Sequence, residues 1–298
     1  IPLDGSTTLS PNAISPQNVA AITATRQLSM SVLGPVAYSP DGRLLAVGVS
    51  EAVSLHDATT LDDRGTWFDH TGKITSLAWS ADSTLLASGA SDDNDIRIWD
   101  VATGTVIRRL SGHTGWIRSL AFAPDGTVLA SGSTDQTVRI WDAATGQLLA
   151  TLSGHTGFIG GVAFSPDSRT LASASRDGSV RLWDVASGRE ISGFSFRTAL
   201  DPTTNLRYWA TGVTFSPDGR TLAVGSTEGV VYLIDATSGQ VIHQLRGHTN
   251  WIVIRGLAFS PDGKTLYSAG LDATVRVWDV ERGVQTATLD VHRLDIFS

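Results

Sequence analysis

Histidine, serine, aspartate and tryptophan, which could all take part in chemistry, recur at matching positions in two stretches of the sequence. GHTGWIRSLAFAPDGTVLASGSTDQTVRIWD occupies residues 112–142, and GHTGFIGGVAFSPDSRTLASASRDGSVRLWD occupies residues 154–184. Serine, histidine and aspartate make up a hydrolytic triad, but such a triad needs one open site with an oxyanion hole. Here the set is repeated, and each copy ends in a tryptophan. We therefore predict that these side chains stabilise the fold and that the protein is not an enzyme.

A metal or cofactor site has little support in the sequence. The chain has no cysteine, which excludes thiolate ligands and disulfides. His56, His243 and His292 form no cluster with the spacing of metal ligands. The acidic stretch SDDND at 91–95 could attract calcium, but it lacks the glycine and the distant glutamate of an EF-hand loop. We predict no metal and no cofactor, and we interpret SDDND as a polar hairpin tip.

The charge balance disfavours two classes of partner. A formal net charge of -7 and a pI near 5.4 provide no basic field for nucleic acid or for an anionic membrane. No stretch approaches the roughly 18 to 20 apolar residues of a membrane-spanning helix. We expect a soluble protein, either cytoplasmic or exported with its signal removed, and the sequence leaves the compartment open.

A turn written SPDG, or close to it, recurs six times. Its aspartates are Asp41, Asp82, Asp125, Asp167, Asp218 and Asp262, with successive gaps of 41, 43, 42, 51 and 44 residues. This periodicity is typical of a repeat architecture. We expect an N-terminal leader over residues 1–23 and a single domain over 24–298, with repeats at about 33–64, 65–107, 108–149, 150–190, 191–242 and 243–289.

Each repeat reads as short strands joined by tight turns. Segments rich in Val, Ile, Leu, Phe and Trp alternate with turns such as PDG and DVATG, where glycine takes a positive φ. The pattern predicts a four-stranded antiparallel meander that is apolar on both faces. Radial stacking covers both faces, so the predicted fold is an all-β propeller. Only residues 18–25 suggest a short helix.

The motifs resemble those of the WD-repeat β-propeller family. GH occurs at 112–113, 154–155 and 247–248, with the variant Asp69-His70, and WD occurs at 99–100, 141–142, 183–184 and 278–279. The likeness covers roughly residues 33 to 289, and the regular spacing resembles bacterial arrays. The resemblance implies a buried hydrogen-bonded chain of His, Ser, Asp and Trp in four repeats. The implied sets are His70, Ser88, Asp92 and Trp99; His113, Ser131, Asp135 and Trp141; His155, Ser173, Asp177 and Trp183; and His248, Ser268, Asp272 and Trp278.

Two departures from the pattern affect these sets. SDDND has one extra residue, so Asp93 is an alternative to Asp92 in the first set. The first repeat lacks the histidine, and the fifth has Val224, Glu228 and Ile234 at the network positions. We expect those two blades to depend on apolar packing and to be less rigid.

Large side chains follow the GH corners. They are Lys73, Trp116, Phe158 and Trp251, and the resemblance places them on the upper face around the central channel. The long fourth gap adds Arg197, Arg207, Tyr208 and Trp209 in a loop of the same class. Arg, Tyr and Trp are common in binding hot spots, so we predict a protein or peptide partner on this face. Alternatively, these side chains cover strand edges or fill the fifth blade.

The two ends of the chain are compatible with two ways of completing the ring of blades. Residues 24–30 suit an outer strand of the last blade, and residues 296–298 look like the start of a seventh first strand. We favour a seven-bladed lineage whose last blade is incomplete, with a closed six-bladed ring as the alternative. An open blade edge would allow self-association.

The favoured function is a non-enzymatic protein–protein interaction scaffold. One alternative is a small-molecule-binding or enzymatic propeller with its site at the central channel, although the first strands offer small and apolar groups there. Another alternative is a sensor or scaffold module of a larger signalling protein.

Overall fold

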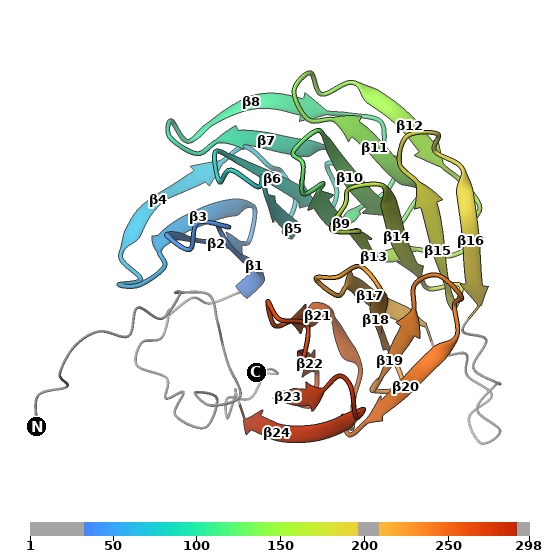
Figure 1. Cartoon of the computed structure of the whole chain (residues 1–298). Coiled ribbons are helices and arrows are strands. Elements are labelled where there is room, and N and C mark those ends of the chain that lie inside the picture. The colour runs from blue at the N-terminus through green and yellow to red at the C-terminus, as the bar shows by residue number, and fades with distance from the viewer. Residues whose placement is uncertain (1–32, 196–208, 291–298) are drawn as a thin grey trace, which may run out of the picture.

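The structure, a computed structural model, describes residues 33–195 and 209–290. These residues form six four-stranded antiparallel sheets with their strands in chain order, and the described part contains no helix (Figure 1). We call the sheets blades 1 to 6 in chain order. The first strand of each blade is the one nearest the centre of the array, and the fourth strand is the outermost. The six blades confirm the predicted all-β propeller fold.

The bounds of the strands follow, blade by blade. Blade 1 contains β1 (Leu33–Tyr38), β2 (Leu44–Val49), β3 (Ala52–Asp57) and β4 (Asp63–Phe68), and blade 2 contains β5 (Ile74–Trp79), β6 (Leu85–Ala90), β7 (Ile96–Asp100) and β8 (Thr105–Leu110). Blade 3 contains β9 (Ile117–Phe122), β10 (Val128–Ser133), β11 (Val138–Asp142) and β12 (Leu148–Leu152), and blade 4 contains β13 (Ile159–Phe164), β14 (Thr170–Ser175), β15 (Ser179–Asp184) and β16 (Glu190–Ser195). Blade 5 contains β17 (Ala210–Phe215), β18 (Thr221–Ser226), β19 (Val230–Asp235) and β20 (Val241–Arg246), and blade 6 contains β21 (Ile252–Phe259), β22 (Thr265–Gly270), β23 (Thr274–Asp279) and β24 (Val284–Asp290).

The SPDG turns form because their polar side chains bond to the local backbone. In blade 1, Ser39 donates to the Asp41 carboxylate at 2.6 Å, and the Arg43 amide donates to the same carboxylate at 3.1 Å. Gly42 has a φ of 72°, which a glycine adopts without a steric penalty. The arrangement fixes the hairpin between the first and second strands and therefore sets their register.

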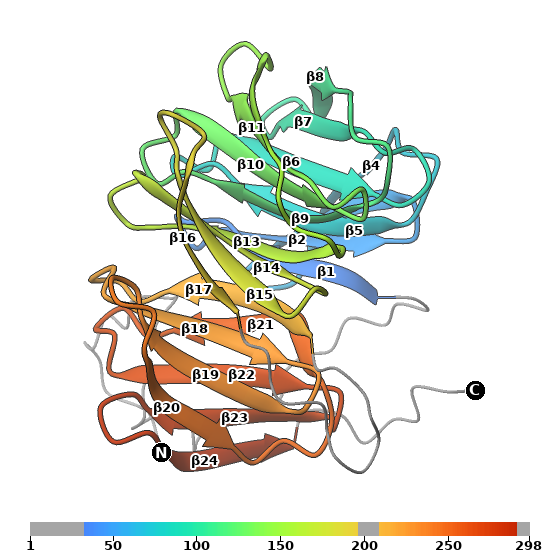
Figure 2. The same cartoon turned by 90° about the vertical axis from the view of Figure 1, so that its right-hand side faces the viewer.

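Neighbouring blades stack against one another (Figure 2) and share apolar clusters. Ile96 and Ile98 of β7 pack with Ile117 and Leu120 of β9 in one buried cluster. A Cβ on Gly89 would overlap the Ile117 side chain, so this glycine permits the close approach of blades 2 and 3. Similar clusters join each successive pair of blades, so blades 2 to 5 have apolar side chains packed on both faces, as the sequence predicted.

First strands of successive blades pack side by side from β1 to β21, whereas within the described ranges β21 does not pack comparably against β1. Val36 and Tyr38 of β1 are 51% and 57% exposed. The expected helix at 18–25, closing strand at 24–30 and end strand at 296–298 lie outside the described residues.

Candidate functional site

Two sets of loops lie at the same end of each blade. In an antiparallel sheet the second strand returns to the end where the first strand began, so the turn after it meets the loop before the first strand. We call this end the His face; it comprises the loops at 69–73, 111–116, 153–158 and 247–251 and the turns at 91–95, 134–137, 176–178 and 271–273. The opposite end, with the SPDG turns, is the SPDG face.

A buried hydrogen-bonded chain crosses blade 3 from the His face inward. His113 Nδ1 lies 2.7 Å from Asp135 Oδ2, and His113 Nε2 lies 2.7 Å from Ser131 Oγ. Trp141 Nε1 donates to the same Ser131 Oγ at 2.8 Å. Because Nδ1 faces a carboxylate it carries the proton, so Nε2 accepts from the serine hydroxyl. The chain ties one loop, one turn and two strands together.

Blades 4 and 6 contain the same chain. In each, the histidine bonds to its aspartate and serine, and the tryptophan donates to the serine. The members are His155, Ser173, Asp177 and Trp183 in blade 4, and His248, Ser268, Asp272 and Trp278 in blade 6.

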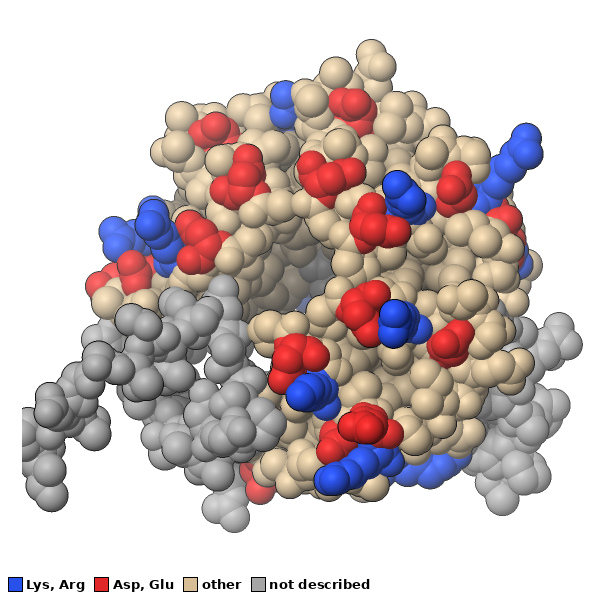
Figure 3. All heavy atoms as spheres, in the orientation of Figure 1, with Lys and Arg blue, Asp and Glu red and all other residues tan. Residues whose placement is uncertain are grey.

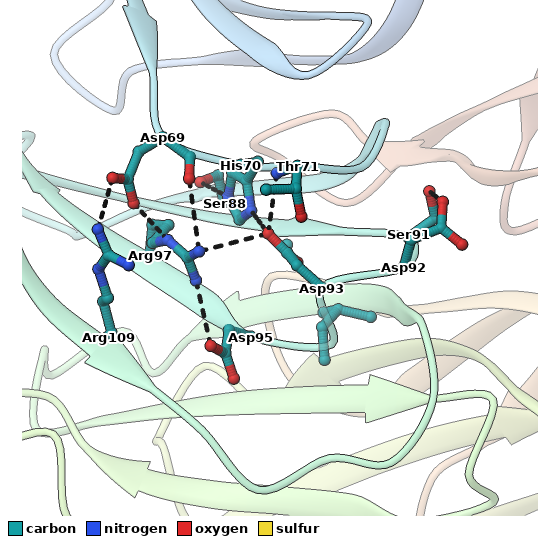
Figure 4. Close-up of polar contacts among 12 residues, drawn as sticks. Asp69, His70, Thr71, Ser88, Ser91, Asp92, Asp93, Asp95, Arg97 and Arg109 are labelled. Carbon is teal, nitrogen blue, oxygen red and sulfur yellow. Dashed lines mark hydrogen bonds and ion pairs between the residues drawn. The ribbon is translucent and has the colours of Figure 1, made fainter.

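In blade 2 the aspartate of the chain is Asp93, and the assignment to Asp92 is wrong. His70 Nδ1 lies 2.7 Å from Asp93 Oδ2, whereas Asp92 accepts from Ser91 and has a φ of 69° (Figure 4). The extra residue in SDDND lengthens the turn by one position, which moves the second aspartate into contact with the histidine. His70 Nε2 and the Trp99 indole both bond to Ser88 at 2.7 Å, as in the other blades.

Blade 2 also has an aspartate where blades 3, 4 and 6 have the glycine of the GH pair. Asp69 accepts from Arg97 at 2.5 Å and from Arg109 at 2.6 Å, and Arg97 also lies 3.5 Å from Asp95 (Figure 4). Asp93 and Asp95 of the acidic stretch therefore lie beside Arg97, whereas Asp92 accepts from Ser91. Among the described residues, no group of three or more histidine, aspartate or glutamate side chains could hold a metal ion.

Burial and hydrogen bonding shift the titration of the network aspartates. Burial raises the pKa of Asp135, but hydrogen bonds from His113 and Thr137 outweigh it and hold the pKa well below its usual range. Burial also raises the pKa of Asp272, but hydrogen bonds from the Thr249 amide and His248 outweigh it and lower the pKa to about 2. The four network histidine side chains are at most 1% exposed. In each of them both ring nitrogens form hydrogen bonds within the blade, so the arrangement suits a structural role.

Blades 1 and 5 hold their interiors differently. In blade 1, His56 occupies the register position that tryptophan has elsewhere, and it bonds to Ser54 on the same strand at 3.0 Å. In blade 5, Val224 and Ile234 are fully buried, and Tyr232 donates to Glu228. Among their described residues, both blades therefore lack a second-strand serine that bonds to both a histidine and a tryptophan.

Most of the predicted binding residues that the structure describes are large and accessible on the His face. Trp116, Phe158 and Trp251 are 44%, 42% and 44% exposed. Lys73 is exposed on the same face, and Trp209 is half-buried. The remaining predicted contacts, Arg197, Arg207 and Tyr208, lie outside the described residues.

Three of these aromatic residues line a pocket on the His face with a volume of about 230 Å³. Phe158, Trp209 and Trp251 come from blades 4, 5 and 6, and the two indoles meet edge to face with their ring centroids 6.3 Å apart. Arg118 of β9 and Arg176 of the turn after β14 line the pocket as well, together with the polar residues Thr211 and Thr227. Trp116 and Lys73 do not line it.

The two arginines were missed by sequence reasoning. Arg176 belongs to the SRDG turn after a second strand, and the rule that such turns lie beside the GH loops could have indicated its place on the His face. Arg118 is the second residue of a first strand, and nothing in its local sequence distinguishes it.

Charges are mixed on the face of the molecule that Figure 3 shows. Figure 3 shows acidic side chains in separate groups around a central hollow, several with Lys or Arg beside them. Another pocket lies along the first strands and is lined largely by apolar side chains, among them Leu120, Phe122, Val162, Phe164 and Val213. The described residues contain no helix with the length and hydropathy needed to cross a membrane.

A radial array of four-stranded blades, four of which contain the His–Asp–Ser–Trp chain, defines a β-propeller of WD repeats. Family comparisons agree with this class: the WD domain, G-beta repeat matches residues 62–100, 104–142, 146–184 and 239–279, together more than half of the chain. The anaphase-promoting complex subunit 4 WD40 domain matches residues 202–254, which include blade 5. The chain belongs to the WD domain, G-beta repeat family.

Curated relatives match shorter parts of the chain. An uncharacterized WD repeat-containing protein of Schizosaccharomyces pombe is 46% identical over 68 residues, 22% of this chain and 11% of the relative. WD repeat-containing protein 1 of Xenopus tropicalis is 41% identical over 76 residues, 24% and 12% of the two chains. Eukaryotic translation initiation factor 3 subunit I of Neurospora crassa is 37% identical over 77 residues, 26% and 22%.

The matched segments thus span between 11% and 22% of the length of these relatives. All three relatives are eukaryotic, so they give no support to the predicted bacterial style of array.

Proposed function

We propose that this WD-repeat protein is a non-enzymatic interaction scaffold that binds a protein or peptide on its His face. The observation that carries the proposal is the set of three aromatic side chains, Trp116, Phe158 and Trp251, each more than two-fifths exposed at equivalent corners of blades 3, 4 and 6. Aromatic residues that are rigidly held and accessible are the usual anchors of interfaces.

The surrounding geometry supports a binding role over mere coverage of strand edges. Phe158 and Trp251 also line a pocket, so part of their exposed area faces a concave site that a partner side chain can fill. The network histidines hold the loops before β9, β13 and β21, which gives the surface a rigid base. One relative is named as a subunit of an initiation factor, which is in line with a role in an assembly.

The central channel supports a metabolite site less well. Its pocket is lined by first-strand residues such as Leu120, Gly161, Val162 and Val213, with no charged side chain to orient a polar ligand. A sensor or scaffold module within a larger protein would use the same His face. Self-association through the exposed Val36 and Tyr38 of blade 1 is a separate expectation that would follow from an open blade edge.

The test is capture of partners with paired variants. We expect the Trp116→Ala/Trp251→Ala protein to lose the partners that the unchanged chain retains, because it loses two interface anchors. Its melting temperature should fall by no more than about 2 °C, since partly exposed side chains contribute little to stability. Phe68→Ala is the matched control, because Phe68 is 72% exposed but lies on the outer strand of blade 1.

Retention of every partner by the double variant would contradict the proposal. Loss of folding in the double variant would assign the two tryptophans to the core and would contradict it as well. Equal loss of partners with Phe68→Ala would show that general surface hydrophobicity, and not the His face, is responsible.

A further inference from the structure

The His-face pocket contains two cations and no acidic residue in its lining. Arg118 and Arg176 contribute guanidinium groups, and the other walls are largely apolar, formed by Phe158, Trp209 and Trp251. Neither guanidinium forms an ion pair with a carboxylate of the described residues, although the chain has more acidic than basic side chains. The pocket therefore holds a positive charge that nothing described in the chain neutralises.

Arginines at other positions of the repeat are used differently. Arg97 bonds to Asp69 at 2.5 Å, Arg181 bonds to Glu190 at 2.6 Å, and Arg276 lies 4.0 Å from Asp272. Those arginines belong to the internal structure of single blades. Arg118 and Arg176 instead face a space formed by blades 3 to 6.

Stacking on aromatic rings fixes one of the two cations. The Arg176 guanidinium lies 4.9 Å from the centroid of the Trp209 ring and 5.7 Å from that of Phe158. Such contacts hold the planar group in place while leaving its N–H donors free for an anion in the plane of the guanidinium. The site is therefore organised before a ligand arrives.

The second cation is in an environment that disfavours its charge. Burial lowers the pKa of Arg118, and the positive charge of Arg176 lowers it further. A ligand anion between the two groups would relieve both effects, because it replaces lost hydration and offsets the repulsion.

Size limits what the pocket takes. Its volume of about 230 Å³ is below the roughly 300 to 1,000 Å³ of sites for small molecules and cofactors. It suits one side chain with an apolar part against the indoles and an anionic end at the arginines. A peptide that lies across the His face can present such a side chain.

We propose that the pocket formed by Arg118, Arg176, Phe158, Trp209 and Trp251 binds an anionic side chain of the peptide partner. The ligand chemistry is a carboxylate or a phosphoryl group attached to an apolar stem. This inference rests on the proposed function, since it names the chemistry of the partner at the same face.

Small probes test the pocket without knowledge of the partner. We expect phenyl phosphate and benzoate to bind the intact chain with roughly millimolar dissociation constants and to quench the fluorescence of the lining tryptophans. Benzylamine, which has the same ring and the opposite charge, should not bind. Tighter binding of phenyl phosphate indicates a phosphorylated side chain, and tighter binding of benzoate indicates Asp, Glu or a chain-terminal carboxylate.

Charge variants show which residues bind the probe. Arg118→Gln and Arg176→Gln should each weaken binding of the anionic probe by about tenfold or more, because each removes a charge-assisted hydrogen bond. Arg118→Lys and Arg176→Lys keep the charge and should retain more affinity than the glutamine variants, and they also control for misfolding. Arg189→Gln is the matched control, because Arg189 is exposed on the SPDG face and its replacement changes the net charge equally.

Equal binding of benzylamine and the anions would overturn the inference, and so would failure of both anions to bind the intact chain. Anion binding that Arg118→Gln and Arg176→Gln leave unchanged would also overturn it. If partner capture is lost with Trp116→Ala/Trp251→Ala but kept with both arginine-to-glutamine variants, the proposed interaction face is supported. Only the proposed anion site is then contradicted. If no variant affects partner capture, the proposed interaction face is contradicted. The probe titration then tests the anion site independently.

Discussion

At the scale of single residues, the serine in the second strand of each network is the point at which two polar side chains meet. Ser131→Ala would leave both the His113 ring and the Trp141 indole without their shared partner inside blade 3. We expect a loss of about 1–3 kcal/mol in the free energy of unfolding, because buried polar groups that lose a hydrogen bond are not rehydrated. Chemical denaturation monitored by circular dichroism measures it.

Ser111→Ala provides the comparison for this prediction, since Ser111 is exposed in the loop before the same blade. Its effect should stay within about 0.5 kcal/mol. An equal and small effect of both substitutions would mean that the network contributes little to stability.

The positions of residues that recur at the same place in each repeat were predictable from the sequence. The positions of residues that occur in only one repeat were not. The chains in blades 3 and 4 follow from their identical spacing, and blade 6 keeps the same serine-to-tryptophan spacing with two more residues between histidine and serine. One extra residue in SDDND changed the member in blade 2 from Asp92 to Asp93. Arg118 and Arg176 lie in different blades, and only the radial assembly brings them to one pocket. A pattern within one repeat carries no information about such a juxtaposition.

At the scale of elements, the glycine after His-Thr sets how closely the loop approaches the neighbouring turn. A Cβ on Gly72 would overlap the backbone carbonyl of Ser91, whereas a Cβ on Gly126 would meet nothing within 4 Å. We expect Gly72→Ala to destabilise the protein by about 3 kcal/mol or more, because backbone must move. Gly126→Ala, at a φ of 73°, should cost only about 1 to 2 kcal/mol. Thermal unfolding of the two variants compares them.

Similar melting temperatures for these two glycine variants would show that the loop at Gly72 relaxes easily. The strands themselves were predictable because turn chemistry marks both ends of each one, as Ser39 and Asp41 do before β2. The glycine contact was not predictable, because it depends on Ser91, in a turn that follows the second strand of the blade.

At the scale of the whole molecule, the network aspartates link stability to acid. The pKa of Asp272 is lowered to about 2, and those of Asp135 and Asp177 are lowered further. An unfolded aspartate titrates near 3.9, so the unfolded chain binds more protons below about pH 4, and the stabilisation is complete only above that value. We expect the melting temperature to fall as the pH decreases from about 4 toward 2.

Differential scanning calorimetry at a series of pH values measures this dependence. Asp135→Asn should flatten the acid limb, because the substituted side chain no longer titrates. A melting temperature that stays constant down to pH 2.5 would contradict the assignment of these carboxylates to the buried chains.

Hydrogen bonds between blades join positions one repeat apart. The Trp79 indole donates to the Ala37 carbonyl at 3.0 Å across 42 residues, and the Asp125 amide donates to Ser168 Oγ at 3.1 Å across 43. A nascent polypeptide thus needs only about one more repeat beyond the ribosome before each sheet meets its neighbour. The order of synthesis can therefore serve as the order of assembly, from the N-terminal blade onward.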